Sequence, residues 1–245
     1  MNAHRLIIAT VGILAALPGW SGTALAQEST TATTTPQPAS PIPKVPPVAV
    51  FLGDSYTKYW GKSGAFIGRP YVIAGQSGAT SEWMLLSKDG KPSLFEAQLA
   101  LKPQVLVIMA GINDFGQGHP PEAVMPNLAT MVTQARAAGI RVVLCTQPPV
   151  GPKGDNYAKS RNTKDNLVKL NGLIRAYCAA NQVVLCDFHP ALVGEDGFRK
   201  PEYHAVNPED DVHPGPKAFE VMTPLAEAAI KTALSQEVNP APAGK

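Results

Sequence analysis

Residues 48–55, VAVFLGDS, mark the point where the chain changes character. Five apolar residues run together from Val48 and stop abruptly at Gly53, Asp54 and Ser55. A short apolar run that ends in a turn signal is typical of a strand buried on both faces. In an open parallel sheet, ligands bind just beyond the carboxyl ends of the strands, which is where Ser55 is expected. Ser55 is therefore a candidate nucleophile, and the rest of the chain must supply a base, an acid and an oxyanion hole.

Four more apolar runs and five helical patterns follow this stretch. The strand-like runs are 71–74, 105–109, 142–145 and 183–186. The helical patterns are 80–87, 93–101, 121–138, 163–180 and a last one that begins near 216. Strands that alternate with helices predict a five-stranded parallel sheet covered on both faces. Right-handed crossovers make this α/β fold a three-layer sandwich.

Two features of this pattern concern proline and long loops. Pro224 falls inside the last helix, and we expect it to bend or interrupt that helix because proline removes a hydrogen bond. The segments 147–161 and 188–212 have loop composition and no period. Long loops in a compact domain often line a site, so both segments are candidates for its walls.

The start of the chain is typical of an exported protein. Residues 1–26 have a basic start, an apolar run at 6–17 and an Ala-x-Ala end, which are the parts of a secretory signal peptide. The apolar run is shorter than the roughly 20 residues that cross a bilayer. We therefore expect cleavage after Ala26, a secreted or periplasmic protein, and no stable membrane insertion.

The predicted folded domain, 48–235, lies between two segments that are poor in apolar residues. Residues 27–47 are rich in Thr and Pro, and they predict either a semi-extended linker or a simple disordered segment. Residues 236–245 predict a disordered tail. Both segments bury too little apolar surface to offset the chain entropy lost on ordering.

The composition and the net charge of the chain argue against some classes of function. Of the 245 residues, 44% are hydrophobic, which is enough for one sizeable core. The net charge is +2 and no run of five Lys or Arg occurs, so we expect neither a nucleic-acid partner nor an anionic membrane surface. We expect a monomer.

The three cysteines predict buried thiols more than a disulfide framework. Cys145 and Cys186 each end a strand-like run, where a thiol usually behaves as a small apolar group. A Cys178–Cys186 bridge is conceivable, but an odd count leaves one thiol free. We expect no disulfide.

Polar clusters follow several predicted strands and together supply nucleophilic chemistry. Ser55 offers a hydroxyl, and the imidazole of His213 can take its proton and return it to a leaving group. Asp210 precedes His213 by three residues and can reach the other ring nitrogen, where it would hold the tautomer. Candidate oxyanion donors are the backbone N–H groups of Ser55 and Gly78 and the side-chain amide of Asn113.

The order of these clusters resembles the four blocks of the SGNH hydrolases, also called the GDSL esterase/lipase family. The blocks are Gly53-Asp54-Ser55, Gly78, Gly111-x-Asn113-Asp114 and Asp210-x-x-His213. The resemblance covers essentially all of 48–235, and the stretch 73–80 is similar to small acetylhydrolase-like and thioesterase-like members. It implies a flavodoxin-like α/β/α sandwich, a Ser55–His213–Asp210 triad, an oxyanion hole of Ser55, Gly78 and Asn113, and no cofactor or metal.

Three positions depart from the family pattern. Tyr56 follows the serine where Leu or Ile is common, Ala74 replaces a frequent Asn or Arg, and Asp211 stands where Gly is common. None of these changes removes a catalytic group. Asp211 leaves open which acid partners His213, and the spacing favours Asp210.

The resemblance and the leader predict a secreted serine esterase that removes a small acyl group, most simply acetyl. An O-acetylated carbohydrate or envelope polymer is the expected substrate, because no apolar groove or lid for long chains is evident. A lipase or thioesterase is the alternative, and so is a non-catalytic polysaccharide-associated binding module. The aromatic side chains that could line the pocket are Trp60, Trp83, Phe115 and Tyr157.

A metal hydrolase is a further alternative with little support. The histidines available for it are His119, His189, His204 and His213. Their spacing matches no common ligand pattern.

Overall fold

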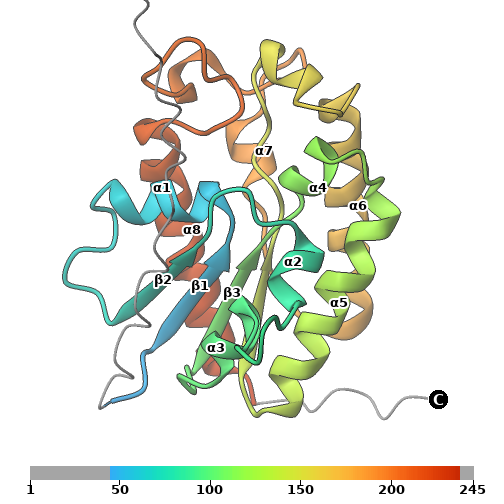
Figure 1. The fold of residues 1–245 in the computed structure, drawn as a ribbon. Helices are drawn as coiled ribbons and strands as arrows, with labels where there is room; N and C mark the ends of the chain where they lie inside the picture. Colours follow the sequence, from blue (N-terminus) through green and yellow to red (C-terminus); the bar gives the residue numbers. More distant parts are fainter. Residues whose placement is uncertain (1–44, 238–245) are drawn as a thin grey trace, which may run out of the picture. The chain divides into compact units, whose positions relative to one another are not determined.

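A five-stranded sheet, all of its strands parallel, organises the computed structural model, which describes residues 45–237 (Figure 1). The sheet order is β2-β1-β3-β4-β5. The strands are β1 (Ala49–Gly53), β2 (Tyr71–Gly75), β3 (Val105–Met109), β4 (Arg141–Cys145) and β5 (Val184–Cys186). The parallel sheet predicted from the apolar runs is confirmed, with strand ends within about two residues of the prediction.

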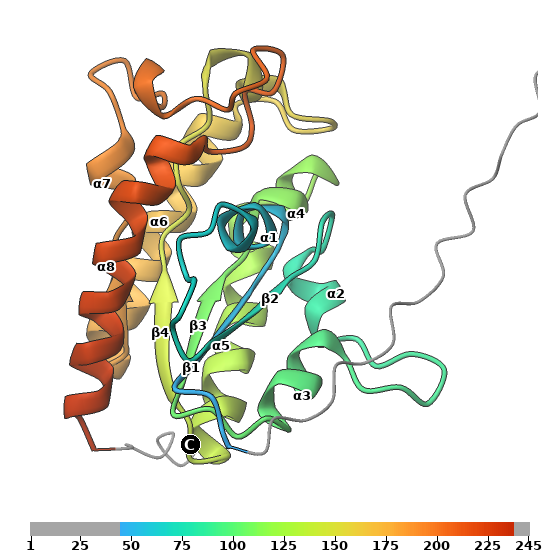
Figure 2. The same cartoon turned by 90° about the vertical axis from the view of Figure 1, so that its left-hand side faces the viewer.

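Helices cover both faces of this sheet (Figures 1 and 2). On one face α1 (Ser55–Lys62) contacts β1 and β2, and α8 (Pro216–Ser235) contacts β3, β4 and β5. On the other face lie α3 (Leu94–Leu99), α5 (Pro121–Ala137) and α6 (Thr163–Asn181). The molecule is thus an α/β sandwich of three layers, as its sequence predicts.

Register brings three strand ends level with one another. Gly53, at the end of β1, pairs with Gly75 of β2 on one side and with Met109 of β3 on the other. The chain therefore leaves all three strands at one edge of the sheet. Ser55, Gly78 and Asn113 follow those ends within a few residues, so the topology gathers them there.

The buried core explains why β1 and β3 read as unbroken apolar runs. Every residue of both strands is buried, because helices pack on each face. An aromatic cluster fills the layer between β1 and α8: Trp60 packs edge-on to Phe51 and stacks parallel to Phe219 with ring centroids 6.3 Å apart. The Trp60 indole N–H also donates to the Thr223 hydroxyl, which joins α1 to α8.

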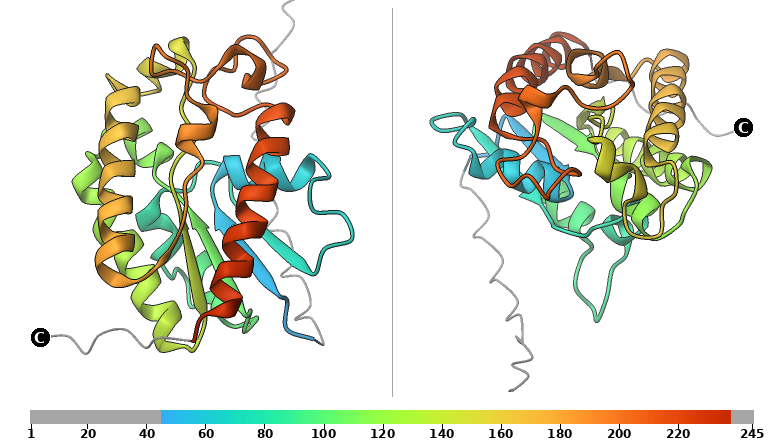
Figure 3. Two further views of the ribbon diagram at one scale, coloured as in Figure 1. Left: turned by 180° about the vertical axis from the view of Figure 1, so that it is seen from behind. Right: turned by 90° about the horizontal axis from the view of Figure 1, so that it is seen from above.

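Several short helices were not predicted. They are α1, α4 (Ile112–Gly116) and α7 (His189–Leu192), together with 3-10 turns η1 (Pro152–Asn156) and η2 (Pro201–Tyr203). Each is too short for an apolar period to emerge from the sequence. The predicted helices at 80–87 and 93–101 are shorter than expected, as α2 (Ser81–Leu85) and α3. η1, α7 and η2 lie in the two predicted loop segments, which rise beyond the carboxyl ends of the strands (Figures 1 and 3).

The expected interruption at Pro224 is wrong. α8 continues through Pro224, although the proline ring leaves the carbonyl of Glu220 without its usual donor. Glu220 and Pro224 both lie on the exposed face of the helix, where water can satisfy that carbonyl. The opposite face, which carries Phe219 and Met222, is buried against the sheet and holds the helix in place.

The predicted leader at 1–26 lies outside the described residues. So do residues 27–44 of the predicted linker and 238–245 of the predicted tail. Within residues 45–237, no helix combines the length and the apolar character needed to cross a membrane.

Candidate active site

Ser55 is the first residue of α1, at the turn where β1 ends. The Asp54 carboxylate caps this helix by accepting the backbone N–H of Tyr56 at 2.9 Å. Gly53 leaves room for the neighbouring strand, because a Cβ there would lie 2.6 Å from the carbonyl oxygen of Met109 on β3. The turn leaves the Ser55 hydroxyl 2.8 Å from Nε2 of His213.

The His213 ring is held from its other side by Asp210. The ring Nδ1 lies 2.8 and 2.9 Å from the two carboxylate oxygens of Asp210. A carboxylate can only accept, so Nδ1 carries the proton and the neutral ring presents a lone pair at Nε2. The Ser55 hydroxyl then donates to that lone pair, which is the arrangement of a nucleophile beside its general base.

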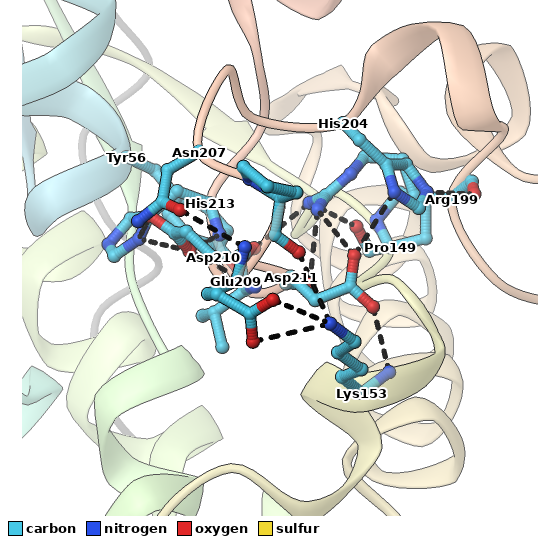
Figure 4. Close-up of polar contacts among 12 residues, drawn as sticks. Tyr56, Pro149, Lys153, Arg199, His204, Asn207, Glu209, Asp210, Asp211 and His213 are labelled. Carbon is cyan, nitrogen blue, oxygen red and sulfur yellow. Dashed lines mark hydrogen bonds and ion pairs between the residues drawn. The ribbon is translucent and has the colours of Figure 1, made fainter.

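The Asp210 carboxylate is itself fixed by the backbone of its own loop. Oδ1 accepts the N–H of His213 at 3.0 Å and that of Val212 at 3.3 Å. The neighbouring Asp211 turns away from His213: its Oδ2 accepts the backbone N–H of Lys153 at 2.7 Å (Figure 4). The structure therefore brings Asp210, and not Asp211, against the imidazole.

Aromatic side chains frame the imidazole on the α1 side. The Tyr59 ring meets His213 edge-on with ring centroids 4.8 Å apart, and the Tyr56 ring does so at 5.6 Å. Of the four aromatic residues expected to line the pocket, Trp60 and Phe115 instead belong to the core. The Trp83 side chain is about half exposed on α2, and Tyr157 contacts Asn113.

Asn113, the predicted side-chain donor, is buried on α4 and oriented from both ends. Its Nδ2 donates to the carbonyl of Ala79 at 3.0 Å, and its Oδ1 accepts the Tyr157 hydroxyl at 3.0 Å. The amide has two N–H groups, so one remains for a ligand after the bond to Ala79. Sequence reasoning did not assign this role to Tyr157, because the contact spans 44 residues.

Two backbone donors complete the set of candidate oxyanion contacts. Gly78 has φ +78°, a conformation that favours glycine, and lies in the exposed turn after β2. Its N–H has no acceptor among the described residues, and the same holds for the N–H of Ser55 at the start of α1. Free N–H groups at a helix start and in a turn are suited to an oxygen that gains negative charge.

Two buried carboxyl groups, those of Asp54 and Asp114, are sequence neighbours of Ser55 and Asn113. Burial, with a smaller contribution from the charge of Asp114, raises the pKa of Asp54 to about 7. Oδ2 of Asp54 has no partner among the described residues. Burial also raises the pKa of Asp114, whose carboxylate accepts the hydroxyl and the N–H of Ser81 at 2.7 and 2.9 Å. Asp114 thereby ties α4 to α2.

Within residues 45–237, no group of three or more His, Cys, Asp or Glu side chains is arranged to hold a metal ion. His204 and His213 instead have acidic partners in Asp211 and Asp210.

Comparison with known proteins gives one family match. The model of the GDSL-like lipase/acylhydrolase family matches residues 51–221, which include every candidate site residue named above. A search of curated proteins finds no match.

Solved structures support the same fold. A GDSL-like lipase from Bacteroides thetaiotaomicron is 26% identical, with a TM-score of 0.62 over 76% of this chain and 88% of that one. A predicted acylhydrolase from Bacteroides fragilis is 24% identical, with a TM-score of 0.61 over 76% and 87% of the two chains. An inhibitor-bound aryl esterase of M. smegmatis, 14% identical, shares the fold with a TM-score of 0.55 over 76% and 98%.

Proposed function

This chain belongs to the GDSL-like lipase/acylhydrolase family and is a serine ester hydrolase, and we propose that Ser55 is its nucleophile. We also propose that the group it removes from its substrate is a small acyl group. One observation carries the assignment: His213 Nε2 lies 2.8 Å from the Ser55 hydroxyl while Asp210 lies 2.8 Å from Nδ1. A serine flanked in this way can lose its proton as it attacks an ester carbonyl.

In the acylation step, the Ser55 oxygen bonds to the carbonyl carbon and its proton passes to His213 Nε2. The carbonyl oxygen becomes an oxyanion, which accepts from the N–H groups of Ser55 and Gly78 and from the free N–H of Asn113. The intermediate collapses as His213 returns the proton to the leaving alcohol. Asp210 stays ionised and stabilises the imidazolium in between.

In the deacylation step, water replaces the departed alcohol beside His213. His213 takes one proton from this water as its oxygen bonds to the acyl carbon. The Ser55–acyl bond then breaks, Ser55 recovers the proton from His213, and the free acid leaves. The protein, the ester and water account for every bond and every proton in the two steps.

A small acyl group on a carbohydrate or envelope polymer is the proposed substrate. In the described part of the chain, the loops around His213 are tied by polar contacts from the buried residues Arg199 and Asp211, which favours a small acyl group over a long apolar chain. The leader-like residues 1–26 and the Thr/Pro-rich segment after them support export, and hence a substrate outside the cytoplasm.

Ser55→Ala tests the catalytic assignment directly. With an activated acetyl ester, we expect kcat to fall by a factor on the order of 10⁴–10⁶ relative to wild type. Ser235→Ala is the matched control, because its hydroxyl is exposed and contacts only its own helix. Undiminished turnover by Ser55→Ala would refute Ser55 as nucleophile, and an inactive wild type would favour the binding module.

Chain length tests the substrate assignment. We expect kcat/KM to be higher for acetyl than for octanoyl esters, and acetate to be released from an O-acetylated polysaccharide. A preference for octanoyl would overturn the small-acyl proposal in favour of a lipase. A preference for acyl thioesters over matched oxygen esters would favour a thioesterase.

A further inference from the structure

The segment that carries Asp210 and His213 has almost no regular structure of its own. Between the bridge residue His204 and the bridge residue Pro214, the chain forms only turns and bends. Nevertheless His213 is held 2.8 Å from Ser55, a residue 158 positions away. Contacts from outside the segment must therefore fix it.

Arg199 supplies several of these contacts. Its side chain is fully buried, and its guanidinium reaches three backbone carbonyls (Figure 4). Nη1 donates to Val212 at 2.9 Å and to Pro149 at 3.2 Å, and Nη2 donates to Asp211 at 3.1 Å. A planar fork of donors suits such a convergence of acceptors, whereas a lysine presents a single point.

Asp211 balances the charge of this guanidinium and anchors the neighbouring loops. Its Oδ1 lies 3.9 Å from Arg199 Nη2 and 3.1 Å from His204 Nδ1. Its backbone carbonyl also accepts the N–H of Gly151 at 2.8 Å. A Cβ at Gly151 would lie 2.1 Å from Asp211 Oδ1, so the 147–161 segment can approach this closely only through glycine.

One carbonyl connects this network to the nucleophile. The oxygen of Val212, the residue before His213, accepts the Tyr56 hydroxyl at 2.8 Å as well as Arg199 Nη1 at 2.9 Å. Tyr56 is fully buried and directly follows Ser55. The neighbour of the candidate base is thus tied to the neighbour of the candidate nucleophile through a single oxygen. Tyr56 and Asp211 are two of the three departures from the family pattern.

We propose that Tyr56 and Arg199 are positioning residues that set the separation of Ser55 and His213 through the Val212 carbonyl. Neither side chain is hydrogen-bonded to Ser55 or to the His213 ring, so the Tyr56 hydroxyl and the Arg199 guanidinium act through the backbone. The Tyr56 ring also meets the His213 ring edge-on, and Tyr56→Phe keeps that contact. The inference rests on the proposed roles of Ser55, His213 and Asp210. It gives a structural role to the hydroxyl group of the buried residue Tyr56.

A double-mutant cycle tests the proposal. Tyr56→Phe removes only the hydroxyl, and Arg199→Lys keeps a charge but loses the fork. We expect each to lower kcat for an activated acetyl ester by about tenfold with KM nearly unchanged, since small displacements of reacting groups are costly. Because both act on one oxygen, the double variant should lose much less than the product of the two factors.

Matched controls lie outside the network. Tyr177→Phe removes a hydroxyl on α6, and Arg175→Lys alters the ion pair with Asp187, whose oxygens lie 2.8 and 2.9 Å from the guanidinium. Both are expected to keep wild-type kcat. Unchanged kcat in Tyr56→Phe, or fully multiplicative effects in the double variant, would overturn the proposal. If Arg199→Lys does not fold, Tyr56→Phe alone still decides it.

A spectroscopic measurement separates this inference from the proposed function. The proton between His213 Nδ1 and Asp210 should give a low-field ¹H NMR resonance in the wild type and in Ser55→Ala, and it should shift or broaden in Tyr56→Phe. An esterase-inactive wild type that shows this pattern would refute the proposed function and support the positioning network. An active wild type whose resonance and kcat are unaffected by Tyr56→Phe would support the proposed function and refute the positioning network.

Discussion

The carboxyl group of Asp54 is harder to ionise in the folded protein than in an unfolded chain. It is fully buried, one oxygen caps α1, and the other has no partner among the described residues. Burial is the main cause of its pKa of about 7, and the charge of Asp114 adds to it. The folded protein therefore holds a proton on Asp54 at pH values where an unfolded chain releases it.

This raised pKa predicts a loss of stability as the pH rises. The contribution is fully present below about pH 4, falls between pH 4 and 7 and is absent above pH 7, and it amounts to at most about 4 kcal/mol. Asp54→Asn keeps the acceptor for Tyr56 but cannot ionise. We expect it to remove this part of the pH dependence, as measured by urea unfolding at pH 5 and pH 8.

Asp165→Asn, on the exposed first turn of α6, is the control for this measurement and is expected to leave the slope unchanged. An unaltered slope in Asp54→Asn would mean that Asp54 is ionised in the folded protein near neutral pH.

Asn113 predicts a second effect of a single residue. Asn113→Ala removes a donor from the proposed oxyanion hole, so kcat for an acetyl ester should fall about 10²–10³-fold with little change in KM. Tyr157→Phe leaves the Asn113 amide in place but removes the hydroxyl that donates to its Oδ1. We expect a smaller loss of kcat, about threefold to tenfold. Steady-state kinetics checks both. A rise in KM at constant kcat would instead assign Asn113 to substrate binding.

At the residue scale, the sequence was informative where neighbours along the chain carry the chemistry. Asp210 and His213 are three residues apart, and the spacing alone favoured Asp210 over Asp211. Tyr157 and Arg199 had no such signal. Their hydrogen-bond partners lie 12 to 50 residues away and are backbone carbonyls or an amide, which no sequence pattern marks.

Among the elements, α1 packs on β2 more closely than a side chain would permit. A Cβ at Gly75 would lie 2.2 Å from the backbone nitrogen of Lys58 and 2.6 Å from its Cα. Backbone atoms cannot rotate aside, so the helix itself would have to move. Because Ser55 begins this helix, the fit between α1 and β2 also sets the place of the nucleophile.

Gly75→Ala is therefore expected to lower the free energy of unfolding by about 1–3 kcal/mol, in the range of overpacked cores. Gly172→Ala is the control: this residue lies inside α6, where a Cβ would meet no atom within 4 Å, and the change should stabilise by about 0.5–1 kcal/mol. Urea unfolding measures both. A neutral Gly75→Ala would contradict the close packing of α1 on β2.

Long elements were predictable and short ones were not. β1 and β3 are buried on both faces, so their apolar runs identify them, and α5 and α6 are long enough for an apolar period. The eight residues of α1 depend instead on the Asp54 cap and on the packing of Trp60. Pro224 does not interrupt α8, because tertiary packing of the opposite face outweighs one lost hydrogen bond.

For the molecule as a whole, the three thiols are buried and free. Cys145 and Cys186 stand opposite each other in the register of β4 and β5. Burial raises the pKa of Cys145 well above its ordinary value and that of Cys178 to about 12. Thiolates, not thiols, are the reactive species, so the folded protein should be inert toward thiol reagents.

Titration with an aromatic disulfide reagent checks this expectation. We expect no reaction in the native state and three reactive thiols after unfolding in urea, as the sequence has three cysteines. Fewer than three after unfolding would indicate a disulfide, and rapid reaction of the native protein would place a thiol at the surface.

The most direct test of the whole account is to trap the acyl group. Wild-type protein is mixed with an activated acetyl ester, quenched in acid within the first turnovers, and digested for mass spectrometry. We predict an acetyl adduct on the peptide that contains Ser55, and no adduct on that peptide in Ser55→Ala. Turnover without any adduct at Ser55, undiminished in Ser55→Ala, would contradict the account.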